Sequence, residues 1–69
     1  MQHKPMMYLV GRMKEDGSIT HIAGIYKSSH WAKSHWDYEW EWQHRPDGWI
    51  AVNHEWPKPC VIEVAVIDG

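Results

Sequence analysis

Phenylalanine is absent from this chain of 69 residues, and cysteine occurs once, at Cys60. One cysteine excludes an internal disulfide, on which secreted domains of this size usually depend, so the sequence predicts a cytoplasmic protein. Long apolar runs are also missing. The longest, residues 60–67, is interrupted by Glu63, and residues 1–5 do not resemble a signal peptide. We therefore expect no membrane association.

The chain has no excess of positive charge either, because it contains 7 basic and 9 acidic residues and has a net charge of −2. This balance makes direct nucleic-acid binding an unfavourable interpretation, since such binding depends on neutralising phosphates. In residues 38–42 the aromatic rings alternate with Glu39 and Glu41 where a single-strand binder would carry Lys or Arg. The remaining composition is that of a globular chain and predicts one domain, residues 1–69, too small to enclose a large active site.

Four segments have the composition of β-strands: residues 6–13, 19–26, 49–56 and 60–67. Asp16-Gly17 lies in the short polar connection between the first two, and this dipeptide predicts a hairpin because Gly accepts a positive φ. Pro57 and Pro59 cannot donate to a sheet ladder, so residues 57–59 are expected to lie outside any central strand. The last segment is the most β-prone and is predicted to be a central strand or a long edge.

The sequence predicts a helix over residues 30–45. Ser28 or Ser29 is suited to cap its N-terminus, and Pro46 with Gly48 is suited to end it. The resulting order is strand, strand, helix, strand, strand. It predicts an α+β fold in which a small, mainly antiparallel sheet of three or four strands carries one helix on one face.

The sequence is rich in aromatic residues of two kinds, with six Trp and three Tyr. On the predicted helix, Ala32, Trp36 and Trp40 would form a stripe facing the sheet. A second stripe would lie on a half-exposed flank, and its members are the predicted partner-binding residues: Trp31, His35, Tyr38 and Trp42. Trp and Tyr are enriched at interface hot spots, which favours this interpretation. The alternative is that both stripes are structural and only fill the core.

Signatures of catalysis and metal binding are weak. His35 and Glu39 alone have the helical spacing of a ligand pair, and no motif supplies further ligands, so no metal site or cofactor is predicted. Cys60 stands between Pro59 and Val61 at the start of an apolar strand, where a buried, inert thiol is expected. No phosphate loop, nucleophile elbow or carboxylate pair is present in the sequence, so we expect a protein that is not an enzyme.

The segment GIYKSSHWA, followed after the predicted helix by PDGW, resembles a pattern of small phage and prophage proteins of unknown function. Phage RNA polymerase inhibitors and several anti-CRISPR proteins are similar in their β-β-α-β order. The resemblance covers residues 7–56. It implies a phage or mobile-element protein that blocks a host nucleic-acid machine, and it carries no functional residue over to this chain.

The leading functional hypothesis is therefore a non-enzymatic protein-interaction module that inhibits a CRISPR effector or an RNA polymerase. Two alternatives belong to other classes. One is a small ligand-binding module whose Trp-lined surface stacks on a sugar or base. The other is a structural homo-oligomer, in which the Trp31 flank or the edge of residues 60–67 pairs with a second copy.

Overall fold

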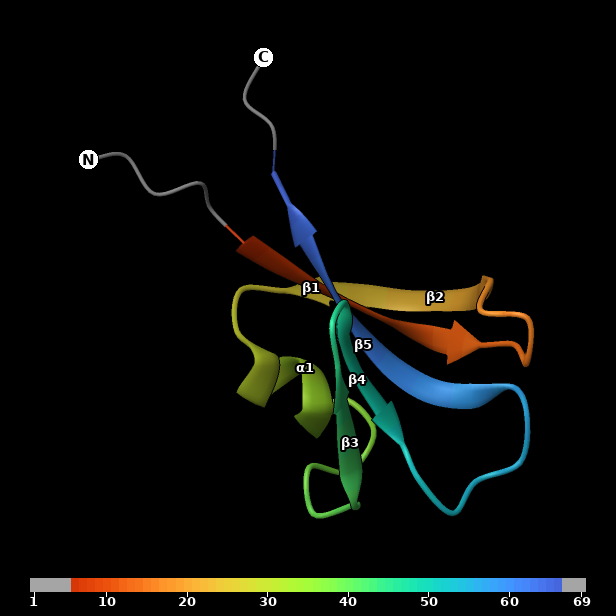
Figure 1. The fold of residues 1–69 in the computed structure, drawn as a ribbon. Helices are drawn as coiled ribbons and strands as arrows, with labels where there is room; N and C mark the ends of the chain where they lie inside the picture. The colour runs from red at the N-terminus through yellow and green to blue at the C-terminus, as the bar shows by residue number, and fades with distance from the viewer. Residues whose placement is uncertain (1–5, 67–69) are drawn as a thin grey trace.

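The structure is a computed structural model that describes residues 6–66, so the expectations for residues 1–5 and for Ile67 fall outside it. It consists of five strands and one short helix (Figure 1). The elements in chain order are β1 (Met6–Met13), β2 (Ile19–Tyr26), α1 (Ser29–Ser34), β3 (Trp42–Arg45), β4 (Gly48–Ala51) and β5 (Lys58–Ala65). No helix of this part of the chain is long and apolar enough to span a membrane.

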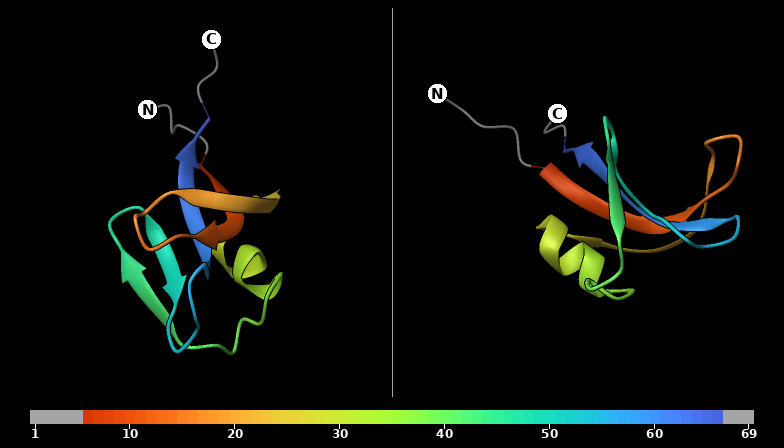
Figure 2. Two further views of the ribbon diagram at one scale, coloured as in Figure 1. Left: turned by 90° about the vertical axis from the view of Figure 1, so that its right-hand side faces the viewer. Right: turned by 60° about the horizontal axis from the view of Figure 1, so that its bottom comes forward.

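All five strands form one antiparallel sheet in the spatial order β2-β1-β5-β4-β3. Every strand pairs with its neighbour in the chain except β2 and β3, and β5 returns to pair with β1. The strands would form a closed ring if β2 also paired with β3, but these two strands are the edges of an open sheet. The helix and the turn after it connect these edges, and Figure 2 shows that the sheet is strongly twisted and curved.

The prediction of the first hairpin is confirmed, because its strands span residues 6–13 and 19–26. Gly17 has a φ of 91°, and its N–H donates to the Lys14 carbonyl at 2.9 Å. The Asp16 carboxylate accepts from the Ser18 hydroxyl at 2.6 Å and from the Ser18 N–H at 2.9 Å. These two hydrogen bonds lower the pKa of Asp16 because they favour its charged form.

The predicted fold class is wrong in its helix and in its number of strands. The helix stops at Ser34 instead of Arg45, and residues 42–45 form the additional strand β3. Pro46 and Asp47 then form the two-residue turn of the β3–β4 hairpin, where Arg45 pairs with Gly48. Pairing with β4 satisfies the backbone of β3 and outweighs the weak helical preference of this aromatic segment.

The strands β4 and β5 also differ from their predicted bounds. β4 ends at Ala51 and not at Trp56, whereas β5 begins at Lys58 and includes Pro59 in a central strand, contrary to prediction. β4 pairs with β5 only from Cys60 onward, whereas Pro59 pairs with Arg12 of β1. Only one neighbouring strand therefore lies beside Pro59, and its missing N–H leaves the β1–β5 pairing intact.

Small apolar clusters lie on the two faces of the sheet. Under α1, Val10, Ala32 and Val61 are fully buried. On the opposite face the buried cluster is Met13, Ile50 and Cys60. Partly buried aromatic rings complete the first cluster, and they are Tyr8, Tyr26, Trp36, Trp42 and Trp49. The missing phenylalanine is thus replaced by Trp and Tyr rings at the rim of the core.

Candidate partner-binding surface

The helix α1 is short but well anchored. The Ser28 hydroxyl accepts from the Trp31 N–H at 3.2 Å, as an N-cap residue does, and the Ser28 carbonyl accepts from the Ala32 N–H. Ala32 is fully buried and brings the helix backbone close to the sheet, as the sequence predicted. Trp31, the residue before it, lies about 100° further around the helix and is exposed on its outer surface.

Two of the predicted partner-binding residues lie together at this outer surface. Trp31 is 63% exposed and Tyr38, in the turn after the helix, is 56% exposed. The imidazole of His30 connects them, with its centroid 5.4 Å from the Trp31 ring and 5.8 Å from the Tyr38 ring. We call Trp31, His30 and Tyr38 the aromatic patch. Sequence analysis missed His30, which becomes recognisable only when Tyr38 folds back beside the helix.

The segment that carries Tyr38 is acidic. Asp37, Glu39 and Glu41 are exposed on the segment that carries Tyr38. Asp37 accepts a hydrogen bond from the Glu39 N–H at 3.0 Å, which holds this turn in place. None of the three forms an ion pair within residues 6–66, where the one ion pair joins Arg45 to Asp47 at 3.8 Å. The segment on the Tyr38 side of the patch is therefore acidic.

His35 lies beyond the patch and contacts the sheet. Its Nδ1 is 2.8 Å from the hydroxyl of Tyr26, and its ring meets the Trp36 ring edge-on at 5.2 Å. This hydrogen bond ties the end of α1 to the end of β2. The His35 side chain is otherwise exposed.

Trp42 is separated from the other predicted partner-binding residues. The helical stripe that placed it beside Tyr38 does not exist, because Trp42 belongs to β3. Its ring continues a stacked column with Trp36 and Trp40, with centroid separations of 6.5 and 6.3 Å, and packs on the cluster beneath α1. The indole N–H groups of Trp36 and Trp42 are buried, and neither has a hydrogen-bond partner among the described residues.

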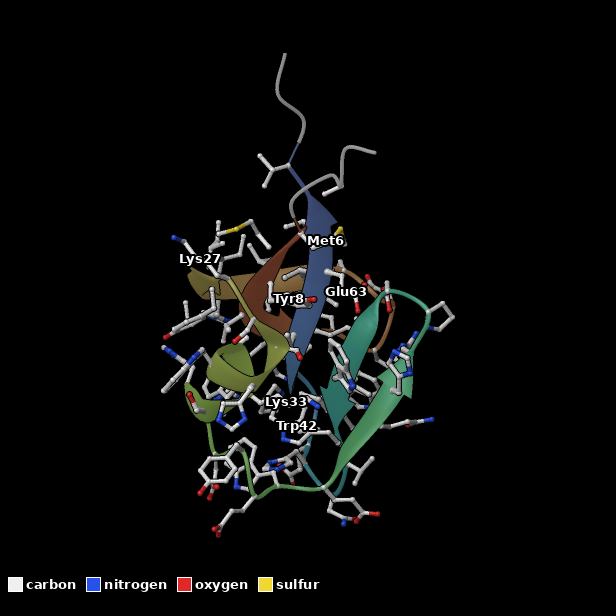
Figure 3. The ribbon with its side chains drawn as sticks, turned by 90° about the vertical axis from the view of Figure 1, so that its left-hand side faces the viewer. Met6, Tyr8, Lys27, Lys33, Trp42 and Glu63 are labelled. Carbon is white, nitrogen blue, oxygen red and sulfur yellow. The ribbon has the colours of Figure 1, made fainter. Side chains whose placement is uncertain are left out.

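A second aromatic group surrounds Trp49 on the α1 side of the sheet. Lys33 Nζ lies 4.5 Å from the centroid of the Trp49 ring, and the His44 ring stacks on it at 5.0 Å. Tyr8 is tilted against Trp49 at 6.1 Å. Figure 3 shows Tyr8, Lys33 and Glu63 from this side, supplied by β1, α1 and β5. Sequence analysis missed this group because the pairing of His44 with Trp49 depends on the unpredicted hairpin.

The remaining chemistry of the described residues is limited. Cys60 is fully buried, and this burial raises the pKa of its thiol to about 11. At neutral pH it therefore stays protonated and poorly nucleophilic. Residues 6–66 contain no group of three or more His, Cys, Asp or Glu side chains placed to hold a metal ion.

Comparison with known proteins found no family model, no curated protein and no solved structure that matches this chain.

Proposed function

We propose that this chain is a non-enzymatic protein-interaction module, and that Trp31 and Tyr38 anchor its partner. The observation that carries the proposal is the aromatic patch. Two large rings are more than half exposed, although Trp36, Trp42 and Trp49 already supply the rim of the core. Trp31 and Tyr38 are therefore not needed to fill the interior, and large exposed rings of this kind are typical of interface hot spots.

The patch is suited to binding because its rings are held before a partner arrives. Trp31 is fixed on a capped helix, and Tyr38 is fixed by the Asp37 turn and by the contact with His30. A held ring loses little conformational freedom on binding, so more of its contact energy contributes to affinity. His35, exposed beside Trp36, extends the surface toward β2.

The proposed partner is a host nucleic-acid machine, such as an RNA polymerase or a CRISPR effector. The resemblance of GIYKSSHWA and PDGW to phage proteins supports this class of partner. The acidic segment beside Tyr38 supports it as well, because Asp37, Glu39 and Glu41 complement the basic surfaces of proteins that bind nucleic acid.

Affinity capture from extracts of the cells that produce the chain, with quantitative mass spectrometry, tests the proposal. Trp31→Ala and Tyr38→Ala should each weaken the binding of a specific partner about 30-fold, which corresponds to roughly 2 kcal/mol of binding free energy. Trp56→Ala is the matched control, because Trp56 is 42% exposed but lies outside the patch. The proposal is wrong if the folded patch variants recover the same proteins in the same amounts as the control.

The group around Trp49 favours a second candidate function, the binding of a small ligand. Lys33, Tyr8 and Glu63 offer donors and acceptors beside an aromatic surface, as sugar and base sites do. Titration of the protein with monosaccharides and nucleosides, followed by tryptophan fluorescence, checks this function. Binding should be saturable and should be lost in Lys33→Met. Unchanged fluorescence at millimolar ligand would exclude this candidate for these ligands.

A further inference from the structure

Several tryptophan rings of the chain are covered by its own cations. In each of three pairs the positive group lies over the ring, between 4.5 and 4.9 Å from its centroid, and the pairs are Arg12 over Trp36, Lys33 over Trp49 and Lys58 over Trp56. The face of an aromatic ring is negative and attracts a cation. The fold therefore satisfies these three rings from within the chain.

The aromatic patch is the exception. Within residues 6–66 no Lys or Arg lies over the ring of Trp31 or Tyr38. Lys33, the basic residue nearest to Trp31 in the sequence, has its ammonium group over Trp49. His30 contacts both rings of the patch, and both rings are nevertheless more than half exposed. The exposed ring surface is therefore open to a cation from another molecule.

Unpaired negative charge lies beside the patch on the Tyr38 side. Asp37 and Glu39 flank Tyr38 in the sequence, both are exposed, and neither forms an ion pair within residues 6–66. One oxygen of Asp37 accepts from the Glu39 N–H at 3.0 Å, which fixes the carboxylate in the turn that carries Tyr38. Exposed charges attract one another over roughly 8 Å at physiological salt. The turn therefore favours a positive group at Tyr38 over a neutral one.

We infer that the aromatic patch receives an arginine side chain of its partner. This inference rests on the proposed function, in which the patch anchors a protein, and it names the group that Trp31 and Tyr38 contact. A guanidinium is planar, so it stacks on an aromatic ring, and its N–H groups donate to a carboxylate at the same time. The patch and the Asp37 turn offer both contacts. A lysine ammonium is more strongly hydrated and has no planar surface, so it binds more weakly.

Nuclear magnetic resonance titration of the full chain with a short peptide of alternating Gly and Arg tests the inference. The indole N–H signal of Trp31 should shift and saturate at millimolar peptide. The same peptide with citrulline in place of Arg keeps the shape without the charge and should bind at least about tenfold more weakly. A Gly-Lys peptide should bind about twofold more weakly or less tightly still. The Trp56 signal is the internal reference, because Lys58 already covers that ring.

Asp37→Asn separates the charge of the turn from its structure. The side-chain oxygen of Asn can still accept from the Glu39 N–H, so the turn is kept while the charge is lost. We expect binding of the arginine peptide to weaken about threefold at low salt, and less as salt is added. Glu55→Gln is the matched control, since it removes an exposed charge next to Trp56 and should leave binding unchanged. Circular dichroism verifies that both variants are folded.

The outcomes separate this inference from the proposed function. Equal binding of the arginine peptide and of either comparison peptide overturns the inference, and so does the absence of a saturable shift at Trp31. In affinity capture, a partner that Trp31→Ala loses and Asp37→Asn retains in full leaves the proposed function standing and overturns the arginine contact. A capture in which Trp31→Ala loses no protein overturns both.

Discussion

At the scale of single residues, Gly48 decides how closely two strands approach. It is buried in β4 opposite Ile62 of β5, and its φ is 146°. A Cβ at this position would overlap the Val61 carbonyl oxygen and would lie 3.0 Å from Ile62 Cα. Only glycine fits here without moving β5. Gly17 has a positive φ of 91° as well, but its surroundings are open, with no atom within 4 Å of an added Cβ.

These two glycines make a matched pair of variants. Gly17→Ala should lose about 1 kcal/mol of unfolding free energy from backbone strain alone. Gly48→Ala should lose a further 1–3 kcal/mol, roughly, because its methyl group overlaps the backbone of β5. Urea unfolding followed by tryptophan fluorescence measures both. Equal losses in the two variants would show that β4 can shift away from β5 without penalty.

At the scale of elements, α1 holds the aromatic patch although the helix is only six residues long. A helix of this length is not stable in isolation, so it depends on its cap and on its contacts with the sheet. The Ser28 hydroxyl accepts from the Trp31 N–H in the first turn, Ala32 packs on Val10 and Val61, and the His35–Tyr26 hydrogen bond holds the end of the helix. Loss of any of these should loosen the patch before it unfolds the sheet.

The N-cap supplies a direct test of this dependence. Ser28→Ala should lower the unfolding free energy by about 1 kcal/mol, because the Trp31 N–H loses its acceptor. Ser29→Ala is the control, since Ser29 is the first residue of the helix and its hydroxyl is not the cap. Thermal unfolding by circular dichroism compares the two. If Ser29→Ala were the more damaging change, the helix would begin one residue later than the structure shows.

At the scale of the whole molecule, the sheet order places β1 and β5 at the centre and β2 and β3 at the edges. The central pair is the longest ladder, running from Met6–Ala65 to Met13–Lys58, and it joins the two halves of the chain. The buried residues Val10, Val61 and Cys60 all belong to these two strands. Local opening should therefore cost the least free energy at the edge strands and the most in this central pair.

Native-state hydrogen exchange of the dilute protein measures that order. Amides of β1 and β5 that bond across their shared ladder should be the slowest to exchange, and those of β3 the fastest among the strands. The reason is that β3 is four residues long and borders only β4. Protection in β3 equal to that in β5 would contradict the observed order and would point to a further neighbour for β3.

The sequence by itself determined the parts of the molecule that rest on local chemistry. The Asp16-Gly17 turn closes the first hairpin as predicted, and Ser28 is one of the two residues predicted to cap the helix. The β-prone residues after Cys60, predicted to be a central strand or a long edge, belong to a central strand. The sequence also placed Trp31 and Tyr38 on a half-exposed flank, with filling of the core as the alternative, and both side chains are exposed in the structure. The hairpin turn and the helix cap depend on neighbours within a few positions along the chain, which a sequence pattern records.

Only the tertiary structure decided the course of residues 35–45. Aromatic and acidic residues alternate in residues 36–42, and this period of two favours an extended chain. The spacing of four between Trp36 and Trp40 favours a helix to the same degree, so the sequence pattern is ambiguous. Pairing of β3 with β4 resolved the ambiguity, and it moved Trp42 from the predicted partner-binding surface to the core beneath α1. Such pairing depends on contacts between distant residues, because a strand is stable only beside its partner, and no local pattern records them.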